Sequence, residues 1–482
     1  MTFQFALPDL PIHFTTKSVT KGANPVSIDL VVAPEKPSPG LPGKQTGDFL
    51  LAQSGDSLEL LVSLGASDKI IPDTFRQAGG SVGKWLRQSG AKAAEFKVSS
   101  DEFDADPSIL QAFLEGVLLG AYRFESFKKE SHSSKPIAFY LQADRPDPAL
   151  TKLAERVTKM ASIVYLARDW AHEPANIINP ETLAERVSAL AGYAGLKCRV
   201  VEMPELEEMG AGGLVNVGKG SKTPSRLIVL EYAGQNPAPG AKPVVLVGKA
   251  LTFDSGGYSL KTTEGIQGMK YDKCGGLAVA ATLLAAAELK VKSPLVGVIG
   301  AAENMVSAEA YRPDDILTML SGKTVEIVST DAEGRLVLAD ALTYSQRNFK
   351  PSAIIDLATL TGGVMVALGR VRAGLMANND ELAQALLASG EATHERLWRL
   401  PLDDDYFNLI KGDDADIKNS GGREAHSVMG GKFLEQFIDD GVKWAHLDIA
   451  AVADLPKDSP YCPKGATGFG IRLLVDYLEN LK

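Results

Sequence analysis

The 482-residue sequence is poor in histidine and cysteine, with six and three residues respectively. The cysteines, Cys198, Cys274 and Cys462, are far apart and odd in number, so the sequence contains neither a disulfide framework nor a CxxC motif. It also contains no HExxH motif and no Cys/His zinc cluster. These shortages exclude a histidine-based metal centre and a disulfide-stabilised secreted scaffold, and they favour a reducing, cytoplasmic compartment.

Long hydrophobic runs are also missing. The longest apolar stretch, Gly275 to Leu289, is interrupted by Glu288 and is shorter than the roughly 18 residues that a membrane span needs. It therefore predicts a buried helix, and we expect no membrane association. The first fourteen residues, MTFQFALPDLPIHF, contain an aspartate and two prolines but no basic segment, so we expect no signal peptide there.

The sequence has fewer basic residues than acidic ones. The sequence has 50 Lys and Arg against 60 Asp and Glu, a net charge of −10. This balance argues against nucleic acid as the main partner, because phosphate binding requires a basic surface. With 45% hydrophobic and 23% charged residues, the chain is typical of a globular protein, and its length indicates roughly two to three domains.

The pattern of apolar segments predicts an α/β fold in two parts. Residues 1–150 alternate strands and helices, as expected for a smaller N-terminal α/β domain. A helical period over about 20 residues within 145–174 predicts a long connecting helix, which we place at 151–172. We assign 173–482 to a larger catalytic α/β domain.

The larger domain is expected to contain a central, mostly parallel mixed sheet. Its near-continuous apolar segments are typical of strands buried on both faces, with crossover helices between them. The predicted strands are 198–203, 226–232, 243–249, 295–302, 324–330, 353–359 and 444–450, and the clearest helices are 275–289 and 336–347. Ligands in such sheets bind outside the carboxyl ends of the strands.

Charged residues follow several of these strands, where ligands are expected. Four are carboxylates, and two lysines and one arginine accompany them: Asp254, Asp272, Asp331, Glu333, Lys249, Lys261 and Arg335. If the segment containing Asp331 and Glu333 is extended, both side chains point to the same side. Four carboxylates in one cleft would repel one another, and two divalent ions would neutralise them. Carboxylates favour Mg²⁺ or Mn²⁺, whereas a lysine amine favours Zn²⁺, Mn²⁺ or Co²⁺.

Three segments carry a clear family resemblance. VGKALTFDSGGYSLK (247–261), MKYDKCGG (269–276) and STDAEGRLVLADAL (329–342) resemble the motifs of the leucyl aminopeptidase (cytosol aminopeptidase) family of metallopeptidases. The resemblance covers 165–482 in collinear order, whereas the first 150 residues are similar only in size and α/β character. It implies an aminopeptidase that releases amino-terminal residues, with a preference for leucine-like apolar ones.

The resemblance implies roles for the charged residues. One metal ion would be held by Asp254, Asp331 and Glu333, and the other by Lys249, Asp254, Asp272 and Glu333. A water activated by both ions would attack the peptide bond. Lys261 would stabilise the oxyanion, and Arg335 would hold a bicarbonate that serves as general base.

The resemblance also implies a substrate pocket and an assembly. The pocket for the first residue would include Met269, Thr359, Leu360, Gly362, Ala450 and Ala453. The chain would form a homohexamer whose interior cavity admits only small peptides. Near the site, Tyr258, Ser329 and the Lys273–Cys274 pair differ from the family pattern; Cys274 is interpreted as a buried, inert thiol.

Other functions remain as alternatives. Some bacterial members of the family also bind DNA in a regulatory role, and a dinuclear phosphoesterase could use the same carboxylates. The segment GLVNVGKG (213–220) has phosphate-loop spacing but ends in Gly220 instead of Ser or Thr, which argues against a nucleoside triphosphatase. His426 could pass for a catalytic base, but we interpret it as a loop residue without a metal partner.

Overall fold

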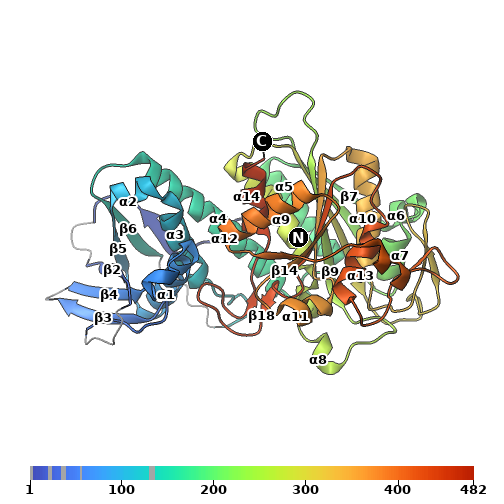
Figure 1. The fold of residues 1–482 in the computed structure, drawn as a ribbon, viewed down its shortest axis with the longest axis horizontal. Helices are drawn as coiled ribbons and strands as arrows, with labels where there is room; N and C mark the ends of the chain where they lie inside the picture. The colour runs from blue at the N-terminus through green and yellow to red at the C-terminus, as the bar shows by residue number, and fades with distance from the viewer. Residues whose placement is uncertain (1–3, 20–23, 34–39, 55–56, 130–135, 482) are drawn as a thin grey trace. The chain divides into compact units, whose positions relative to one another are not determined.

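The computed structural model describes residues 4–19, 24–33, 40–54, 57–129 and 136–481. The chain forms two compact units (Figure 1). The N-terminal unit lies within Leu7–Leu166 and Leu455–Gly465. The larger unit lies within Met1–Ala6, Ala167–Asp454 and Ala466–Lys482. The predicted boundaries at 150 and 172 fall on either side of Leu166–Ala167, where the chain passes between the units inside helix α4, Pro148–His172.

The N-terminal unit is a six-stranded sheet in the order β1-β6-β5-β2-β4-β3. All its pairs are parallel except β3 with β4. The elements are β1 Ile12–Thr15, β2 Val26–Val31, β3 Phe49–Ser54, β4 Ser57–Ser63, α1 Pro72–Ser89, β5 Ala93–Val98, α2 Ser100–Ala105, α3 Pro107–Ala121 and β6 Ile137–Ala143. Helices α1 and α3 pack closely because glycines face the opposing backbone: a Cβ on Gly79 or Gly83 would lie 2.1 or 2.0 Å from a carbonyl oxygen of α3.

The segment Leu455–Gly465 completes this unit from far along the sequence. The hydroxyl of Tyr461 donates to Asp73 Oδ1 at 3.0 Å, and the ammonium of Lys84 donates to the Ser459 carbonyl. Gly80 of α1 lies against the backbone of Pro460. The segment therefore packs along α1, although it is synthesised after nearly all of the larger unit.

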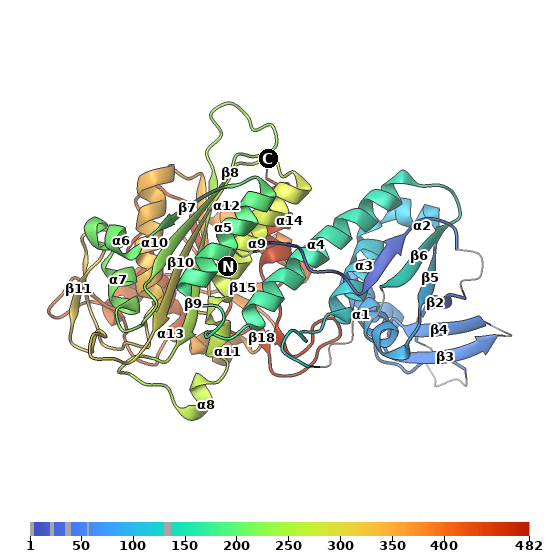
Figure 2. The same cartoon turned by 180° about the vertical axis from the view of Figure 1, so that it is seen from behind.

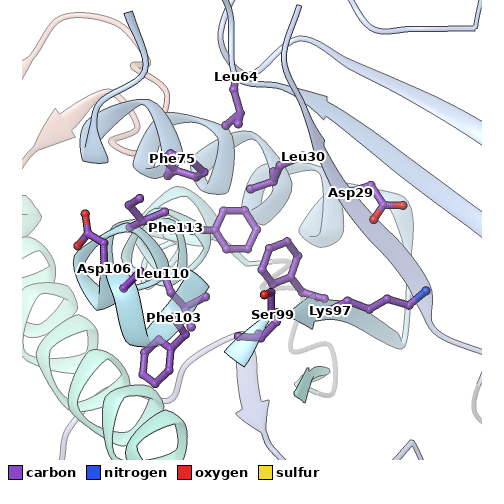
Figure 3. Close-up of a pocket in the computed structure, with 14 residues that line it drawn as sticks. Asp29, Leu30, Leu64, Phe75, Lys97, Ser99, Phe103, Asp106, Leu110 and Phe113 are labelled. Carbon is purple, nitrogen blue, oxygen red and sulfur yellow. The ribbon is translucent and has the colours of Figure 1, made fainter. Parts of the chain in front are cut away.

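A pocket of about 580 Å³ opens at the carboxyl ends of β2 and β5 in the N-terminal unit (Figure 3). Its lining is mostly apolar and includes Leu30, Phe75, Phe103 and Phe113. In the close-up, the side chains of Leu30, Phe75 and Phe113 lie near one another. Lys97 extends away from these rings. This end of the sheet therefore presents an apolar recess at the surface of the unit.

The larger unit is built on an eight-stranded mixed sheet in the order β15-β14-β17-β13-β9-β10-β8-β7, and it confirms the predicted fold class. The four central strands, β17, β13, β9 and β10, are parallel. The strands are β7 Lys197–Val201, β8 Arg226–Tyr232, β9 Val244–Asp254, β10 Leu295–Asn304, β13 Ala353–Ala358, β14 Ala373–Ala377, β15 Leu397–Arg399 and β17 Trp444–Asp448. The central strands are continuously apolar because helices cover both faces.

One helical layer contains α5 Pro180–Ala194, α9 Cys274–Leu289, α12 Asp380–Thr393 and α14 Ile471–Glu479 (Figure 1). The opposite layer contains α7 Gly212–Gly218, α10 Gly334–Phe349 and α13 His426–Glu435 (Figure 2). Shorter elements are α6 Met203–Met209, α8 Thr263–Ile266, η2 Met269–Lys273 and α11 Gly362–Leu368. Among the described residues, none of the helices combines the length and apolar character that crossing a bilayer requires.

The prediction that 324–330 forms a strand of the central sheet is wrong. Only Thr324–Glu326 is a strand (β12), and it lies in a separate three-stranded sheet between β11, Ile316–Thr318, and β16, Ile417–Lys418. The physical reason lies in the alternation of the segment: Val325 and Ile327 are buried, whereas Val328 is 46% exposed. This period of two is typical of a strand with one buried face.

Candidate metal centre

The predicted charged residues meet at the carboxyl end of β9. Lys249 lies within this strand and Asp254 ends it, whereas Asp272 lies on η2 and Glu333 directly precedes α10. These four residues are at most 6% exposed. The elements come from distant parts of the sequence, so the cluster is a product of the parallel sheet and its crossover connections.

Lys249 links two of the carboxylates. Its ammonium lies 2.8 Å from Asp272 Oδ1 and 2.9 Å from Glu333 Oε1, and it donates to the Thr359 carbonyl at 3.0 Å. Gly334 is needed beside it, because a Cβ there would lie 2.4 Å from Lys249 Cε. Through these three contacts Lys249 joins η2, the start of α10 and the residue that follows β13.

Lys261 links the other two carboxylates. Its ammonium lies 2.7 Å from Asp254 Oδ2 and also contacts Asp331 Oδ1. The chain reaches Lys261 through a tight loop in which Gly256 and Gly257 have φ of 85° and 63°. Only glycine adopts this region readily, and a Cβ on Gly256 would lie 2.5 Å from the Ser259 carbonyl oxygen.

The expected extended geometry of Asp331 and Glu333 is wrong. Asp331 lies in a turn, and Glu333 already has helical backbone angles where α10 begins. Asp331 is also the most exposed member of the cluster, with a side chain 38% exposed. The turn, and not a strand, brings both carboxylates to the cluster, because α10 starts immediately after them.

Burial and mutual repulsion perturb these acids. Burial, together with Asp254, raises the pKa of Glu333 to about 8, although Lys249 opposes the shift. Burial also raises the pKa of Asp272 to about 6. The carboxylates outweigh the effect of burial on the lysines and raise the pKa values of Lys249 and Lys261. The acids are thus crowded enough that their ionised forms require positive charge close by.

The donor set fits a divalent cation. Ligand atoms of Asp254, Asp272 and Glu333 all lie within 4.8 Å of one another, and all three residues are buried. Asp272 Oδ2 and Glu333 Oε2 are buried without a hydrogen-bond partner among the described residues. A buried carboxylate oxygen without a partner is costly, and a metal ion would satisfy it.

Arg335 lies on the first turn of α10 and is 1% exposed. It donates to the Asn419 carbonyl at 2.7 Å, and its Nε is buried without a partner in the described part of the chain. Burial lowers its pKa to about 10, which still leaves the guanidinium charged at neutral pH. An anion beside it would use that remaining donor.

The predicted pocket residues differ in their contacts with this cluster and in their burial. Thr359 contacts it directly, because its hydroxyl donates to Asp272 Oδ1 at 2.7 Å. Leu360 and Ala450 are half-buried neighbours whose N–H groups donate to the same carboxylate, that of Asp448. Met269 is half-buried on η2, and Gly362 is exposed at the start of α11.

Ala453 stands apart from the other predicted pocket residues. It is 1% exposed and lines a small internal cavity with Cys274 and Phe469. Burial raises the pKa of the Cys274 thiol to about 12, which agrees with the interpretation of an inert cysteine.

Sequence reasoning missed Asn304, which orients Asp254. Its amide donates to Asp254 Oδ1 at 2.8 Å and to the Thr330 carbonyl at 3.0 Å. Asn304 ends β10, and its register partner on β9 is Asp254 itself. A polar residue at the end of the neighbouring buried strand was the signal that could have found it.

Two alternative motifs do not form the sites that their spacing suggested. Most of GLVNVGKG lies in helix α7, and a phosphate loop would need this segment as a turn before a helix. His426 is the first residue of α13 and not a loop residue. Burial and the nearby Arg335 lower the pKa of His426, which favours its neutral form.

Family models match most of the chain. The cytosol aminopeptidase family's catalytic-domain model matches residues 165–475, and its N-terminal-domain model matches residues 57–131. The N-terminal match corrects the expectation that the first 150 residues share only size and α/β character with the family. The larger unit carries every candidate residue within the matched range.

Curated relatives and solved structures are similar to this chain over most of its length. A "Probable cytosol aminopeptidase" of Syntrophotalea carbinolica is 45% identical over 450 residues, covering 91% of this chain and 89% of its own length. One from Caulobacter vibrioides is 41% identical over 418 residues, covering 86% of this chain and 83% of its own length. The structure of the bottromycin maturation enzyme BotP in complex with Mn has a TM-score of 0.85 and 32% identity, covering 95% of this chain and 99% of that one.

The matched ranges, the identities over most of both chains and the buried carboxylate cluster lead to one assignment. The chain belongs to the cytosol aminopeptidase family of metal-dependent hydrolases, which remove amino-terminal residues from peptides.

Proposed function

We propose that this chain is a dinuclear metal aminopeptidase that releases apolar, leucine-like residues from the free amino ends of small peptides. The observation that carries the proposal is the set of three buried carboxylates whose ligand atoms lie within 4.8 Å, two of them with an unpartnered oxygen, beside two lysines. Two ions would be held by Asp254, Asp331 and Glu333 and by Lys249, Asp254, Asp272 and Glu333.

When bound, divalent ions would acidify a water molecule and polarise the scissile carbonyl. Mn²⁺ or Zn²⁺ suits the mixed carboxylate and amine donors, and Mg²⁺ or Co²⁺ is a further possibility. The similar enzyme BotP has a structure in complex with Mn, which supports Mn²⁺ as the ion of the proposed site. For Lys249 to act as a ligand, its amine must lose the proton that the surrounding carboxylates now stabilise.

The chain's own residues would do the rest of the chemistry. Lys261, 17% exposed, can turn its ammonium from Asp254 and Asp331 towards the developing oxyanion. Arg335 would bind bicarbonate through its unpartnered Nε, and the bicarbonate would take the proton of the attacking water. The free α-amino group of the substrate would bind one of the metal ions as a neutral amine, which would select for an unblocked amino end.

The first side chain of the substrate would be surrounded by Met269, Thr359, Leu360, Gly362, Ala450 and Ala453, of which Ala453 is 1% exposed. Their small or apolar character favours leucine-like residues.

The decisive experiment is an initial-rate panel after chelation. Leucine amide, N-acetyl-leucine amide and a phosphate ester are each assayed with Mn²⁺, Zn²⁺, Mg²⁺ or Co²⁺ added back. We expect metal-dependent hydrolysis of leucine amide alone. Cleavage of the acetylated substrate or of the ester would contradict the proposal, and ester cleavage would instead support a phosphoesterase.

The assembly belongs to the same proposal. A homohexamer with an enclosed cavity would restrict substrates to small peptides and would not need nucleic acid as a partner. Sedimentation velocity should give a single species of six chains. A mobility-shift assay with duplex DNA at physiological salt should show no complex, and a salt-sensitive complex would support the regulatory DNA-binding role.

A further inference from the structure

A buried carboxylate outside the metal cluster joins the two segments that form most of the proposed first-residue pocket. Asp448 ends β17 and is 0% exposed. Its Oδ1 accepts from the N–H groups of Leu360 at 3.2 Å, Thr361 at 3.4 Å and Ala450 at 3.3 Å. Its Oδ2 accepts from the Thr361 hydroxyl at 2.6 Å.

The turn that Asp448 holds leads directly to the cluster. Thr359 precedes Leu360, and its carbonyl accepts from Lys249 while its hydroxyl donates to Asp272. The hydroxyl of Thr361 also lies 2.9 Å from that of Ser427 on α13, which fixes the far side of the turn. One carboxylate therefore reaches the backbone of two predicted pocket segments, 359–362 and 450.

A histidine on the same strand interacts electrostatically with Asp448. His446, two residues earlier on the same side of β17, lies 2.5 Å from Asp356 Oδ1 through its Nδ1, and Trp444 donates to Asp356 Oδ2 at 2.7 Å. Burial lowers the pKa of His446, but Asp356 and Asp448 outweigh it and raise the pKa. The Asp356 and Asp448 carboxylates therefore both favour the protonated form of His446.

We propose that Asp448 is a positioning residue that sets the shape of the first-residue pocket and thereby the selectivity of the enzyme for the amino-terminal residue. The inference rests on the proposed aminopeptidase function. Asp448 contacts the backbone of the pocket and none of the metal-cluster side chains, so its removal should alter substrate placement before it alters metal binding. A displacement of about 1 Å at such a site can cost on the order of 100-fold in rate.

The test compares kcat and KM for leucine, phenylalanine and alanine amides in Asp448→Asn, Asp448→Ala, Thr361→Val and Thr361→Ser. We expect kcat/KM for leucine amide to fall about 10-fold in Asp448→Asn and Thr361→Val, and about 100-fold in Asp448→Ala. The ratios among the three substrates should change, with KM rising. Thr361→Ser, which keeps the hydroxyl, should restore wild-type ratios. Bound metal per chain should stay unchanged.

Asp340→Asn is the matched control, since Asp340 is an equally buried carboxylate that accepts from the backbone N–H groups of Leu214 and Leu320, which are not among the predicted pocket residues. It should lose stability without any change in substrate ratios. Unchanged ratios in folded Asp448→Asn and Thr361→Val would overturn the inference, as would loss of bound metal in either. If the wild type hydrolysed none of the amides, the proposed function itself would fail; a wild type that is active beside unaltered variants would refute only the role of Asp448.

Discussion

At the scale of single residues, the candidate site consists of two lysines and four carboxylates. Lys249 is buried between Asp272 and Glu333, whereas Lys261 is partly exposed between Asp254 and Asp331. The two ammonium groups therefore differ in freedom. The buried one fixes the position of the carboxylates, and the partly exposed one can move towards a substrate.

Replacing Lys261 by methionine should remove oxyanion stabilisation while leaving the carboxylates in place. We expect kcat/KM for leucine amide to fall about 100- to 1000-fold, the usual effect of losing one oxyanion donor. Metal content, measured by elemental analysis after dialysis, should stay at the wild-type value. Lys222→Met, a change at an exposed lysine, should leave both quantities unaltered. Wild-type turnover in Lys261→Met would exclude a catalytic role for this side chain.

The difference in exposure between Asp331 and Asp272 should appear as a difference in metal binding. The Asp331 side chain is 38% exposed and that of Asp272 is 6% exposed. An Asp331→Asn variant should lose one of the two ions on dialysis at low metal concentration, whereas Asp272→Asn should weaken binding of the other. Elemental analysis of the two variants in parallel checks this, and equal retention of both ions in both would contradict the assignment.

At the scale of secondary structure, the carboxyl end of β9 and several short irregular elements together give the site its geometry. The loop after Asp254 places the ammonium of Lys261, and the turn before α10 places the carboxylates of Asp331 and Glu333. The prediction identified the residues from their types and their places after apolar strands. It missed the turn at Asp331, because the start of α10 at Gly334 depends on how the helix packs and not on the local motif.

The strands were also predictable only where the local sequence pattern determines them. Strands buried on both faces, such as β9, are predictable from their continuous apolar runs. The 324–330 segment was assigned to the wrong sheet, because its alternation was read as an apolar run. Asn304 and Asp448 were missed because their roles arise from strand register and from a turn brought close by the fold. The place of each residue at the end of a buried strand is visible in the sequence, but the partner that each one contacts is not.

The Gly256→Ala variant tests the loop between Asp254 and Lys261. Its positive φ and the nearby Ser259 carbonyl and Asp331 carboxylate make any Cβ unfavourable. We expect a loss of about 1–3 kcal/mol in the free energy of unfolding, together with loss of activity. Gly210→Ala is the control, because its φ is also positive but nothing lies within 4 Å of the added Cβ. It should lose stability alone; full activity in Gly256→Ala would show that the loop tolerates distortion.

Asp340 on α10 should make the stability of the larger unit depend on pH. It joins α10 to α7 and to the end of the β11 segment through the N–H groups of Leu214 and Leu320. Burial raises its pKa to about 7 in the folded chain, so the folded state binds its proton more tightly than the unfolded state does. This contribution to stability is complete below pH 4 and is lost as the pH rises through about 7.

The measurement is urea unfolding of the wild type and Asp340→Asn at pH 5, 6, 7 and 8. The free energy of unfolding of the variant should fall less steeply with rising pH than that of the wild type. Parallel curves for the two proteins would mean that another group causes the pH dependence.

At the scale of the whole molecule, the chain leaves and re-enters its N-terminal unit. Leu455–Gly465 lies between two segments of the larger unit in sequence but packs with α1. No composition shift marks this excursion, because long-range contacts alone determine to which unit the segment belongs. The two-part organisation was therefore predictable in outline, whereas this discontinuity was not.

Tyr461→Phe tests the contribution of that segment to the N-terminal unit. The Tyr461 hydroxyl donates to Asp73, a buried carboxylate that also pairs with Arg76 at 2.8 Å. Its loss should lower the free energy of unfolding by about 1.5–3 kcal/mol, the usual range for a hydrogen bond to a charged group. Differential scanning calorimetry and the leucine amide assay together check this. An unchanged thermal transition, or a large change in kcat at a temperature where the protein is folded, would contradict it.

The same excursion has a consequence for biosynthesis. Leu7–Leu166 emerges from the ribosome first, whereas the segment Leu455–Gly465, which packs against α1, begins to emerge roughly 290 residues later. At translation rates of 5–20 residues per second, this delay lasts about 15 to 60 s. During that interval Asp73 and Gly80 lack the neighbours that cover them in the finished protein. The nascent N-terminal unit should therefore be a client for chaperones until the end of the chain is made, and truncations before Leu455 should be degraded even when they retain every residue of its sheet.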